Sequence, residues 1–351
     1  SAKRYGIDAL GAMAQGLFCS LLIGTIINTL GEQLGVPFLV DVGSYASAMS
    51  GAAMAVAIGY ALQAPPLVLF SLVTVGYAAN ALGSTSLIPD QAGAGGPLAV
   101  LFIAVIAAEF GKAVSKETKI DILVTPLVTI LVGVGLSAWW APAIGTAATA
   151  VGNIIMWATD LQPFLMGIVV SVVIGVALTL PISSAAICAA FGLTGLAGGA
   201  AVAGCCANMV GFAVLSFREN RWGGLVSQGL GTSMLQMPNI VRNPRIWLPA
   251  ILTSAITGPL ATCVFHLEMN GPPVSSGMGT CGLVGQIGVW TGWLAPSERA
   301  IANGAVAITP GVMDWAGLIL ISFVLPAVLC WAFGLFFRRI GWIKEGDLTL
   351  E

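Results

Sequence analysis

Two glycine-rich elements carry the polar residues best suited to bind a ligand. The first spans Gly229–Ser233 and reads Gly-Leu-Gly-Thr-Ser, and the second spans Gly277–Cys281 and reads Gly-Met-Gly-Thr-Cys. Glycine permits a close approach of the backbone. Free N–H groups at the start of a short helix attract anionic or hydroxyl-rich ligands. The repeated chemistry therefore predicts two loops that meet at one solute site.

The candidate substrate-binding residues come from these elements and from polar side chains nearby. They are Gly231, Thr232, Ser233, Gln236, Asn239, His266, Glu268, Gly277, Gly279, Thr280 and Gln286. Their hydroxyls and amides would hydrogen-bond a polar solute, and His266 and Glu268 would lie near the outer mouth of the site. The competing explanations are close glycine packing between membrane helices for the two motifs, and simple exposure at the membrane surface for His266 and Glu268.

The composition places these elements in a membrane. Of the 351 residues, 57% are hydrophobic and only 8% are charged, whereas a soluble protein carries about 25% charged residues. Several apolar runs reach the roughly 20 residues that span a bilayer. The chain is predicted to be an all-α polytopic membrane protein, in contact with lipid and without a nucleic-acid partner.

Residue types that bind metals or catalyse reactions are sparse. The seven cysteines include no Cys-x-x-Cys pair, and a single histidine cannot complete a zinc site. No nucleophilic triad, phosphate-binding loop or pair of catalytic carboxylates is evident in the sequence. We therefore expect no metal, no cofactor and no enzymatic activity.

Positively charged loops orient the chain, because such loops favour the cytoplasm. This rule puts both termini inside. Predicted spans cover residues 9–30, 45–62, 67–82, 98–111, 122–140, 246–265 and 315–337. Residues 31–42 are predicted to form an outer loop, and residues 141–161 an interfacial helix. Residues 163–217 must cross an odd number of times, either three times or once with an added dip.

Two segments must enter and leave the membrane on the same side. Arginines flank Trp222–Val241 at both ends, so this segment is predicted to be an inner re-entrant loop. Gly271–Thr309 is predicted to be a hairpin that opens outward, with Gly277–Gly282 in its descending arm and Pro296–Arg299 at its turn. Broken helices that approach the midplane from opposite sides are typical of transporters. Residues 1–351 are interpreted as a single membrane domain, with both elements in 162–351 and the N-terminal helices in 1–161.

The stretch from Gly229 to Gln286 resembles the PfoR-like, or toxin-regulator-like, group of bacterial membrane proteins. The resemblance rests on Gly231–Asn239, Asn243–Trp247 and Gly277–Gln286. That group is classed with enzyme IIC, the membrane component of the phosphoenolpyruvate-dependent sugar phosphotransferase system. The resemblance implies a homodimer with about ten spans per subunit and two re-entrant hairpins. It also implies elevator-like alternating access, in which one part moves against a scaffold.

Two departures from the family pattern affect the predicted function. Glucose-type enzyme IIC proteins hold the sugar with a glutamate in a Thr-Glu-Pro-like element, whereas Asn270–Ser275 contains no acid and Glu268 is the nearest substitute. No IIB-like or IIA-like domain is attached, so a IIB-like partner would be a separate protein. The leading hypothesis is a transporter of a small polar or anionic solute, such as a sugar. A membrane regulator that senses a ligand, and a lipid- or fatty-acid-binding protein, are the alternatives.

Overall fold

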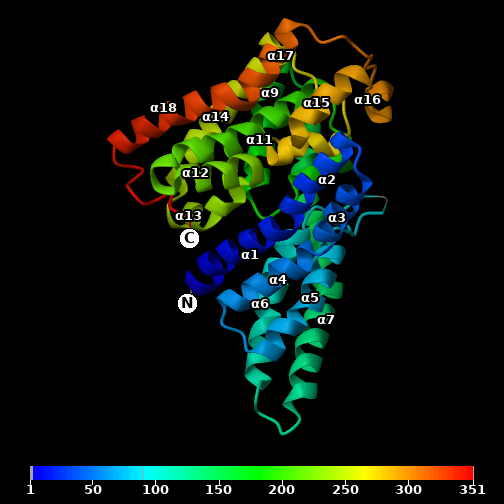
Figure 1. The fold of residues 1–351 in the computed structure, drawn as a ribbon, viewed down its shortest axis with the longest axis vertical. Helices are drawn as coiled ribbons and strands as arrows, with labels where there is room; N and C mark the ends of the chain where they lie inside the picture. Colours follow the sequence, from blue (N-terminus) through cyan, green and yellow to red (C-terminus); the bar gives the residue numbers. More distant parts are fainter. Residues whose placement is uncertain (1–2, 90, 351) are drawn as a thin grey trace. The chain divides into compact units, whose positions relative to one another are not determined.

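The computed structural model describes residues 3–89 and 91–350. These residues are predominantly helical, and they contain no β-strand, only the isolated bridges Thr85–Ala92 and Gly195–Met269. The chain forms two compact units, one of residues 1–149 and 181–183 and the other of residues 150–180 and 184–351 (Figure 1). The interpretation of the whole chain as one membrane domain stays a prediction.

The first unit consists of long helices joined by short turns. Its helical segments are η1 (Lys3–Asp8), α1 (Ala9–Leu17), η2 (Phe18–Leu22), α2 (Ile23–Leu34), α3 (Pro37–Ala48), α4 (Ser50–Ala61), α5 (Pro66–Gly83), α6 (Gly96–Val114) and α7 (Asp121–Thr149). Both η1 and η2 are π-helical, and they make η1 to α2 one apolar helix of 32 residues.

The second unit contains more short and broken helices. Its helices from the N-terminal part are α8 (Val151–Thr159), α9 (Pro163–Thr179), α10 (Ser184–Ala190), α11 (Gly195–Leu215), α12 (Phe217–Val226), η3 (Ser227–Gly231), η4 (Ser233–Gln236), α13 (Met237–Arg242) and η5 (Pro244–Trp247). Those that follow are α14 (Leu248–Pro259), η6 (Leu260–Val264), η7 (Pro273–Gly277), η8 (Cys281–Leu283), α15 (Val284–Leu294), α16 (Glu298–Ala302), α17 (Val312–Ile319), η9 (Leu320–Val324) and α18 (Leu325–Arg339).

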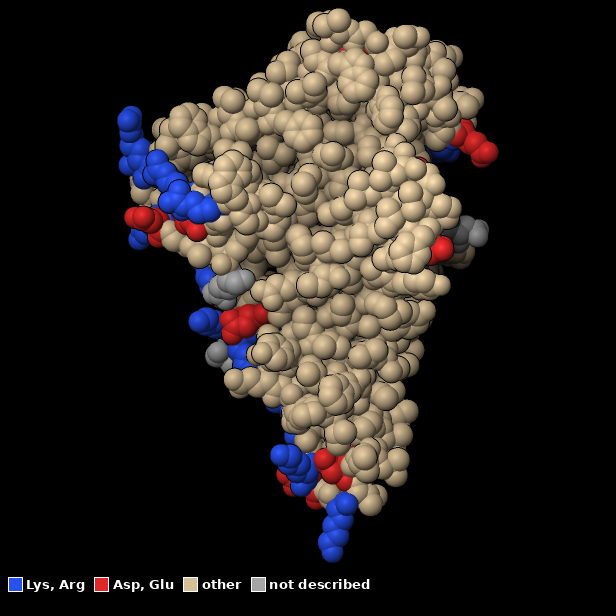
Figure 2. All heavy atoms as spheres, in the orientation of Figure 1, with Lys and Arg blue, Asp and Glu red and all other residues tan. Residues whose placement is uncertain are grey.

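The helices confirm a polytopic, all-α membrane protein. In the described part of the chain, seven helices are long and apolar enough to cross a membrane. The number rises to eight if α3 and α4, which are bent by 47°, form one broken span. Charged side chains gather at the turn between α6 and α7 in the first unit and around the C-terminal end of α18 in the second (Figure 2). Many large apolar side chains of the membrane helices are exposed, among them Phe70, Leu131 and Val328.

The predicted outer loop at residues 31–42 is wrong, because most of it is helical. Helix α2 continues to Leu34, and Gly35 ends it in the left-handed conformation, with φ of 65°. Pro37 then starts α3, where its fixed φ suits the first helical turn. Only residues 35 and 36 separate the two helices, and α2 packs against α3.

Helix α7 continues beyond the predicted end at Trp140. It runs to Thr149, so residues 141–149 belong to α7, and the separate short helix within the predicted interfacial segment 141–161 is α8, which begins at Val151. The place of α8 at the membrane surface stays a prediction. The reason for the longer α7 is a buried stripe of small residues every fourth position: Thr125, Thr129, Gly133, Ser137, Ala141 and Gly145. Small residues let membrane helices approach closely, and the stripe carries the packed face of α7 past Trp140 without interruption.

Residues 163–217 contain one long helix and a shorter pair. Helix α11 is a candidate membrane span of 21 residues, whereas α9 has 17 residues and α10 has seven. The number of membrane crossings in residues 163–217 stays a prediction. Helix α11 is buried on all sides in the second unit, where α9, α14 and α18 pack around it.

Candidate functional site

The two glycine-rich elements contact each other in the second unit. The Thr280 hydroxyl donates a hydrogen bond to the Gly229 carbonyl. Gly279 has φ of 53°, and a Cβ atom at this position would lie 2.6 Å from the Cβ of Cys205. Glycine is therefore required both for the backbone conformation and for the close approach to α11. The structure thus brings together two motifs that lie about fifty residues apart in the sequence.

The hydroxyls of the first element are bonded to other protein groups. The chain changes from the π-helical η3 to extended backbone at Thr232, whose side chain accepts a hydrogen bond from the Met234 N–H at 3.1 Å. Ser233 Oγ lies 2.7 Å from Thr179 Oγ1 at the end of α9. Thr232 and Ser233 are both buried, as is Gly231. In this conformation they tie the element to its neighbours.

The second element forms the turn of its hairpin, contrary to the predicted turn at Pro296–Arg299. Backbone with positive φ reverses the chain at Gly279, Gly282 and Leu283. Ser297 returns to the start of the hairpin, where its N–H donates to the Asn270 carbonyl at 2.9 Å. Ser297 Oγ also donates to the Gly271 carbonyl at 2.9 Å. Pro296–Arg299 therefore lies at the base of the hairpin, and Gly277–Leu283 lies at its tip.

Gly277 in the tip and Gln286, three residues after it, also contact neighbouring protein groups. The Ser184 hydroxyl donates to the Gly277 carbonyl at 2.7 Å, which joins α10 to the hairpin. Gln286 Nε2 donates to Ser322 Oγ at 3.0 Å and contacts Cys206 Sγ at 3.2 Å. Gln286 Oε1 is buried and has no hydrogen-bond partner among the described residues. This acceptor remains available to a polar group.

Gln236 and Asn239 bind the C-terminal tail, residues 340–350. Gln236 Nε2 donates to the Leu348 carbonyl at 3.0 Å, and Asn239 Nδ2 donates to the Thr349 carbonyl at 2.9 Å. Asn220 Nδ2 donates to the same Leu348 carbonyl at 2.8 Å. These amides satisfy backbone groups of the tail and hold it against the first element.

Leu348→Ala is expected to destabilise the second unit. The Leu348 side chain is fully buried, and loss of a buried leucine costs about 2–5 kcal/mol through lost transfer energy and a residual cavity. Thermal unfolding of the purified protein in detergent would measure the loss. Leu34→Ala is the control, because Leu34 is 68% exposed. Equal changes in Tm for the two variants would show that the tail contributes little to stability.

A polar cavity lies near Glu268. Its volume is about 580 Å³, and its walls come from the ends of α8 and α9, the start of α11 and the loop after α16. Polar side chains lining it are Thr159, Thr194, Glu268, Asn270, Arg299 and Asn303. We refer to it as the Glu268 cavity. A volume of this size is typical of sites for small molecules.

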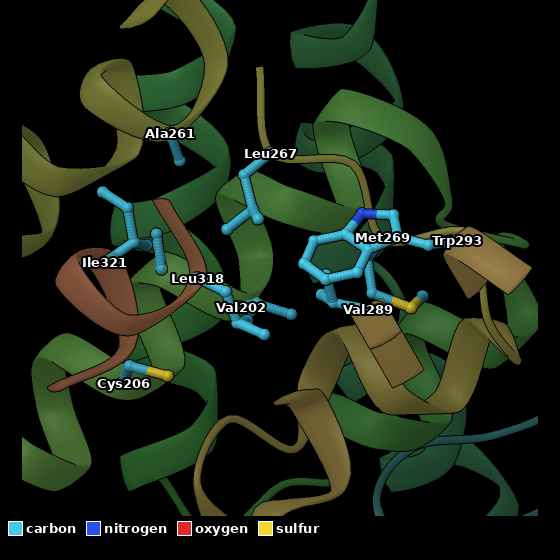
Figure 3. Packing of buried hydrophobic residues seen from close by; sticks show 10 residues of the cluster. Val202, Cys206, Ala261, Leu267, Met269, Val289, Trp293, Leu318 and Ile321 are labelled. Carbon is cyan, nitrogen blue, oxygen red and sulfur yellow. The ribbon is translucent and has the colours of Figure 1, made fainter. Parts of the chain in front are cut away.

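The position of Glu268 follows from the alternation of buried and exposed residues along an extended segment. Leu267 and Met269 are buried in an apolar cluster with Val202 and Trp293 (Figure 3). Met269 also exchanges two backbone hydrogen bonds with Gly195, each of 3.0 Å. Because successive side chains of extended backbone point to opposite faces, Glu268 is directed away from the cluster. Asn270 Nδ2 donates to Glu268 Oε2 at 2.8 Å.

Arg299 and Asn303 reach the cavity from the region that follows the hairpin. Arg299 lies over Gly192, since a Cβ atom on Gly192 would be 2.4 Å from Arg299 Nε. Asn303 Nδ2 donates to Thr194 Oγ1 at 3.1 Å, which links this region to the start of α11. Glu268 and Arg299 make no ion pair within residues 3–89 and 91–350. Both charges are therefore available to a bound solute.

A family model described as "Phosphotransferase system, EIIC" matches residues 7–350. The chain belongs to this family. No curated protein and no solved structure gives a significant match. Membership makes the chain a membrane transporter component of a phosphotransferase system, which works with cytoplasmic IIB components and is not catalytic by itself.

The geometry separates the predicted site residues of this EIIC protein into groups. Glu268 lines the cavity, whereas His266 is exposed, has φ of 46° and is not among the lining residues. The residues of the glycine-rich elements are buried at their contact with one another and with α9 to α11. The set of eleven binding residues stays a prediction.

Sequence reasoning missed the other polar side chains that line the cavity, which are Thr159, Thr194, Asn270, Arg299 and Asn303. Arg299 offered a usable signal, because an ionisable residue inside an apolar hairpin is costly and usually functional. The sequence analysis uses Arg299 only to place the turn of the predicted hairpin. Thr194 and Asn303 gave no comparable signal, since neither belongs to a motif and their proximity arises from tertiary packing.

Proposed function

We propose that this EIIC protein transports a small polar or anionic solute, such as a sugar or a sugar acid, and binds it in the Glu268 cavity. The observation that carries the proposal is a carboxylate and a guanidinium in one cavity with two amides. Glu268 would accept hydrogen bonds from hydroxyl groups, and Arg299 would bind a carboxylate or a hydroxyl oxygen. Asn270 and Asn303 can both donate and accept, which suits a polyhydroxylated solute.

We assign the glycine-rich elements to the path of the solute through the protein. Gly231, Thr232, Ser233, Gly277, Gly279, Thr280 and Gln286 would face the solute when the Thr280–Gly229 contact opens. Gln236 and Asn239 would also face the solute if the C-terminal tail moves away from them. His266 would lie near the outer mouth of the path. This scheme is elevator-type alternating access, with the second unit as the part that carries the solute.

The same proposal includes the oligomeric state, the membrane and the partner of the protein. The protein would act as a homodimer in a bacterial cytoplasmic membrane, with both termini inside. A separate IIB-like protein would supply the phosphoryl group for coupled uptake, and the narrower relationship would be to the PfoR-like group.

A thermal-shift panel tests the proposed ligand class. Purified protein would be heated with sugars, sugar acids, nucleobases, vitamins and fatty acids in turn. A ligand at a hundredfold excess over its dissociation constant stabilises by about 2.7 kcal/mol. Stabilisation by a polar solute supports the proposal. A response to fatty acids alone would contradict it and favour a lipid-binding protein.

Thr280→Ala is expected to change transport more than binding. The substitution removes the hydrogen bond to Gly229 and leaves the Glu268 cavity intact. Solute affinity should stay close to that of the wild-type protein, because the lost hydrogen bond lies outside the Glu268 cavity. The uptake rate should change about fivefold, which corresponds to a net contribution of about 1 kcal/mol from one hydrogen bond. Equilibrium binding and vesicle uptake would be measured on the same variant. Equal losses in both would show that Thr280 belongs to the binding site itself.

A further inference from the structure

Two cavities at the C-terminal end of α18 adjoin each other. One is a mainly apolar groove of about 350 Å³, whose walls include Phe217, Trp222 and Leu225 of α12 and Trp331 and Leu335 of α18. The other is a polar pocket of about 570 Å³ between the start of α12, the end of α18 and the C-terminal tail. Arg218 and Arg338 line both cavities. The two arginines therefore stand at the boundary between an apolar and a polar compartment.

The charges at this boundary leave one guanidinium free. Arg338 pairs with Glu219 at 2.8 Å and donates to the Leu215 carbonyl at 3.3 Å. Arg218 is exposed and makes no hydrogen bond or ion pair with any residue that the structure describes. Lys344 also lines the polar pocket. Arg338 and Glu219 neutralise each other as an ion pair. The remaining charged residues that line the pocket are Arg218, Lys344 and Glu345, so its net charge is positive and favours an anion.

The surroundings indicate a membrane surface. Trp222 is 71% exposed and Trp331 is 54% exposed, although both are large and apolar. Exposed tryptophans beside arginines are enriched where lipid headgroups meet the hydrocarbon core. Figure 2 shows Lys and Arg gathered at this end of α18. Basic pockets between helices at such a surface bind anionic headgroups.

We propose that this composite site binds an anionic phospholipid. An acyl chain would occupy the groove between α12 and α18, and the phosphate would bind Arg218, with Lys344 nearby. Both compartments are needed to recognise this ligand. A free phosphate would leave the apolar groove empty, and a fatty acid would leave the polar pocket unfilled. Because α12 leads directly into the first glycine-rich element, the bound lipid would hold α12 against α18.

Native mass spectrometry of the detergent-purified protein tests this site. The protein would be titrated with phosphatidylglycerol and with phosphatidylcholine of the same acyl chains. Phosphatidylglycerol should bind more tightly, and Arg218→Gln should weaken it about fivefold, the equivalent of about 1 kcal/mol per basic residue near an anionic surface. Trp222→Ala should weaken it as well, because the groove loses apolar wall. Arg339→Gln is the matched control, since Arg339 is adjacent in sequence to Arg338 but lines neither cavity.

Several outcomes would overturn the proposal. Equal affinity for the two lipids would show that the headgroup charge is not recognised. Equal losses in Arg218→Gln and Arg339→Gln would indicate diffuse attraction to the basic surface. If inorganic phosphate or a free fatty acid competes as effectively as the phospholipid, the site binds that simpler ligand and not a phospholipid. Arg218 has no partner to lose, so Arg218→Gln is expected to fold normally.

Discussion

Glu268→Gln is expected to lower solute affinity by about 10- to 100-fold, since hydrogen bonds to a charged group contribute about 1.5–3 kcal/mol. Glu268 is the only carboxylate among the described residues that line the cavity. Glutamine keeps the size of the side chain and one acceptor oxygen but removes the charge. Isothermal titration with the solute found in the thermal-shift panel would measure the effect. The fold should be unaffected, because Glu268 is exposed and its single recorded side-chain bond is to Asn270.

Glu298→Gln is the control for this substitution. Glu298 is exposed, precedes Arg299 at the start of α16 and does not line the cavity. The variant makes the same change in charge close to the site, so it measures any general electrostatic effect. If both variants lose the same affinity, or if neither does, the carboxylate of Glu268 is not a solute ligand.

Gly199→Ala should disrupt both the stability of the second unit and solute binding. A Cβ atom on Gly199 would lie 1.7 Å from the Leu267 carbonyl oxygen, which is backbone and cannot rotate away. Either α11 or the segment that carries Glu268 must move. Overpacking of this kind costs about 1–3 kcal/mol and occasionally more. Thermal unfolding in detergent would report the loss of stability, and titration would report the displacement of Glu268.

Gly135→Ala serves as the comparison for Gly199→Ala. Gly135 also lies within a long helix, but a Cβ atom there has no neighbour within 4 Å. Alanine is the better helix former, so this variant should keep or slightly raise the Tm. A Gly199→Ala protein with unchanged Tm and unchanged solute affinity would show that the 266–269 segment is not held against α11 as the structure indicates.

The class of the fold was predictable from composition and hydropathy, because a membrane requires long apolar helices. The contact between the glycine-rich elements was also foreseen, since glycine and hydroxyl residues in a membrane must pack against protein or line a cavity. Helix ends were less predictable. The polar and small residues of 31–42 suggested a loop, yet Gly35 and Pro37 confine the break to two residues. The predicted span 122–140 ended too early, because the small-residue stripe of α7 continues past Trp140.

The cavity could not be derived in full from the sequence. Glu268 was identified because a carboxylate in an apolar region stands out. Its partners come from distant segments, with Thr194 at the start of α11 and Asn303 after α16. Arg299 was assigned to a turn, because charge patterning alone cannot reveal that Ser297 closes the hairpin onto Asn270. Tertiary contacts of this kind leave no local pattern in the sequence.

Solute uptake into proteoliposomes tests the central claim most directly. Wild-type protein, Glu268→Gln and Glu298→Gln would be reconstituted at equal density and supplied with the radiolabelled solute identified by thermal shift. Wild-type protein and Glu298→Gln are expected to move the solute, and Glu268→Gln is expected to lose most of this flux. Binding without any flux in wild-type protein, even when cytoplasmic IIB components are supplied, would contradict transport and favour a sensor. Undiminished flux in Glu268→Gln would show that the solute crosses elsewhere.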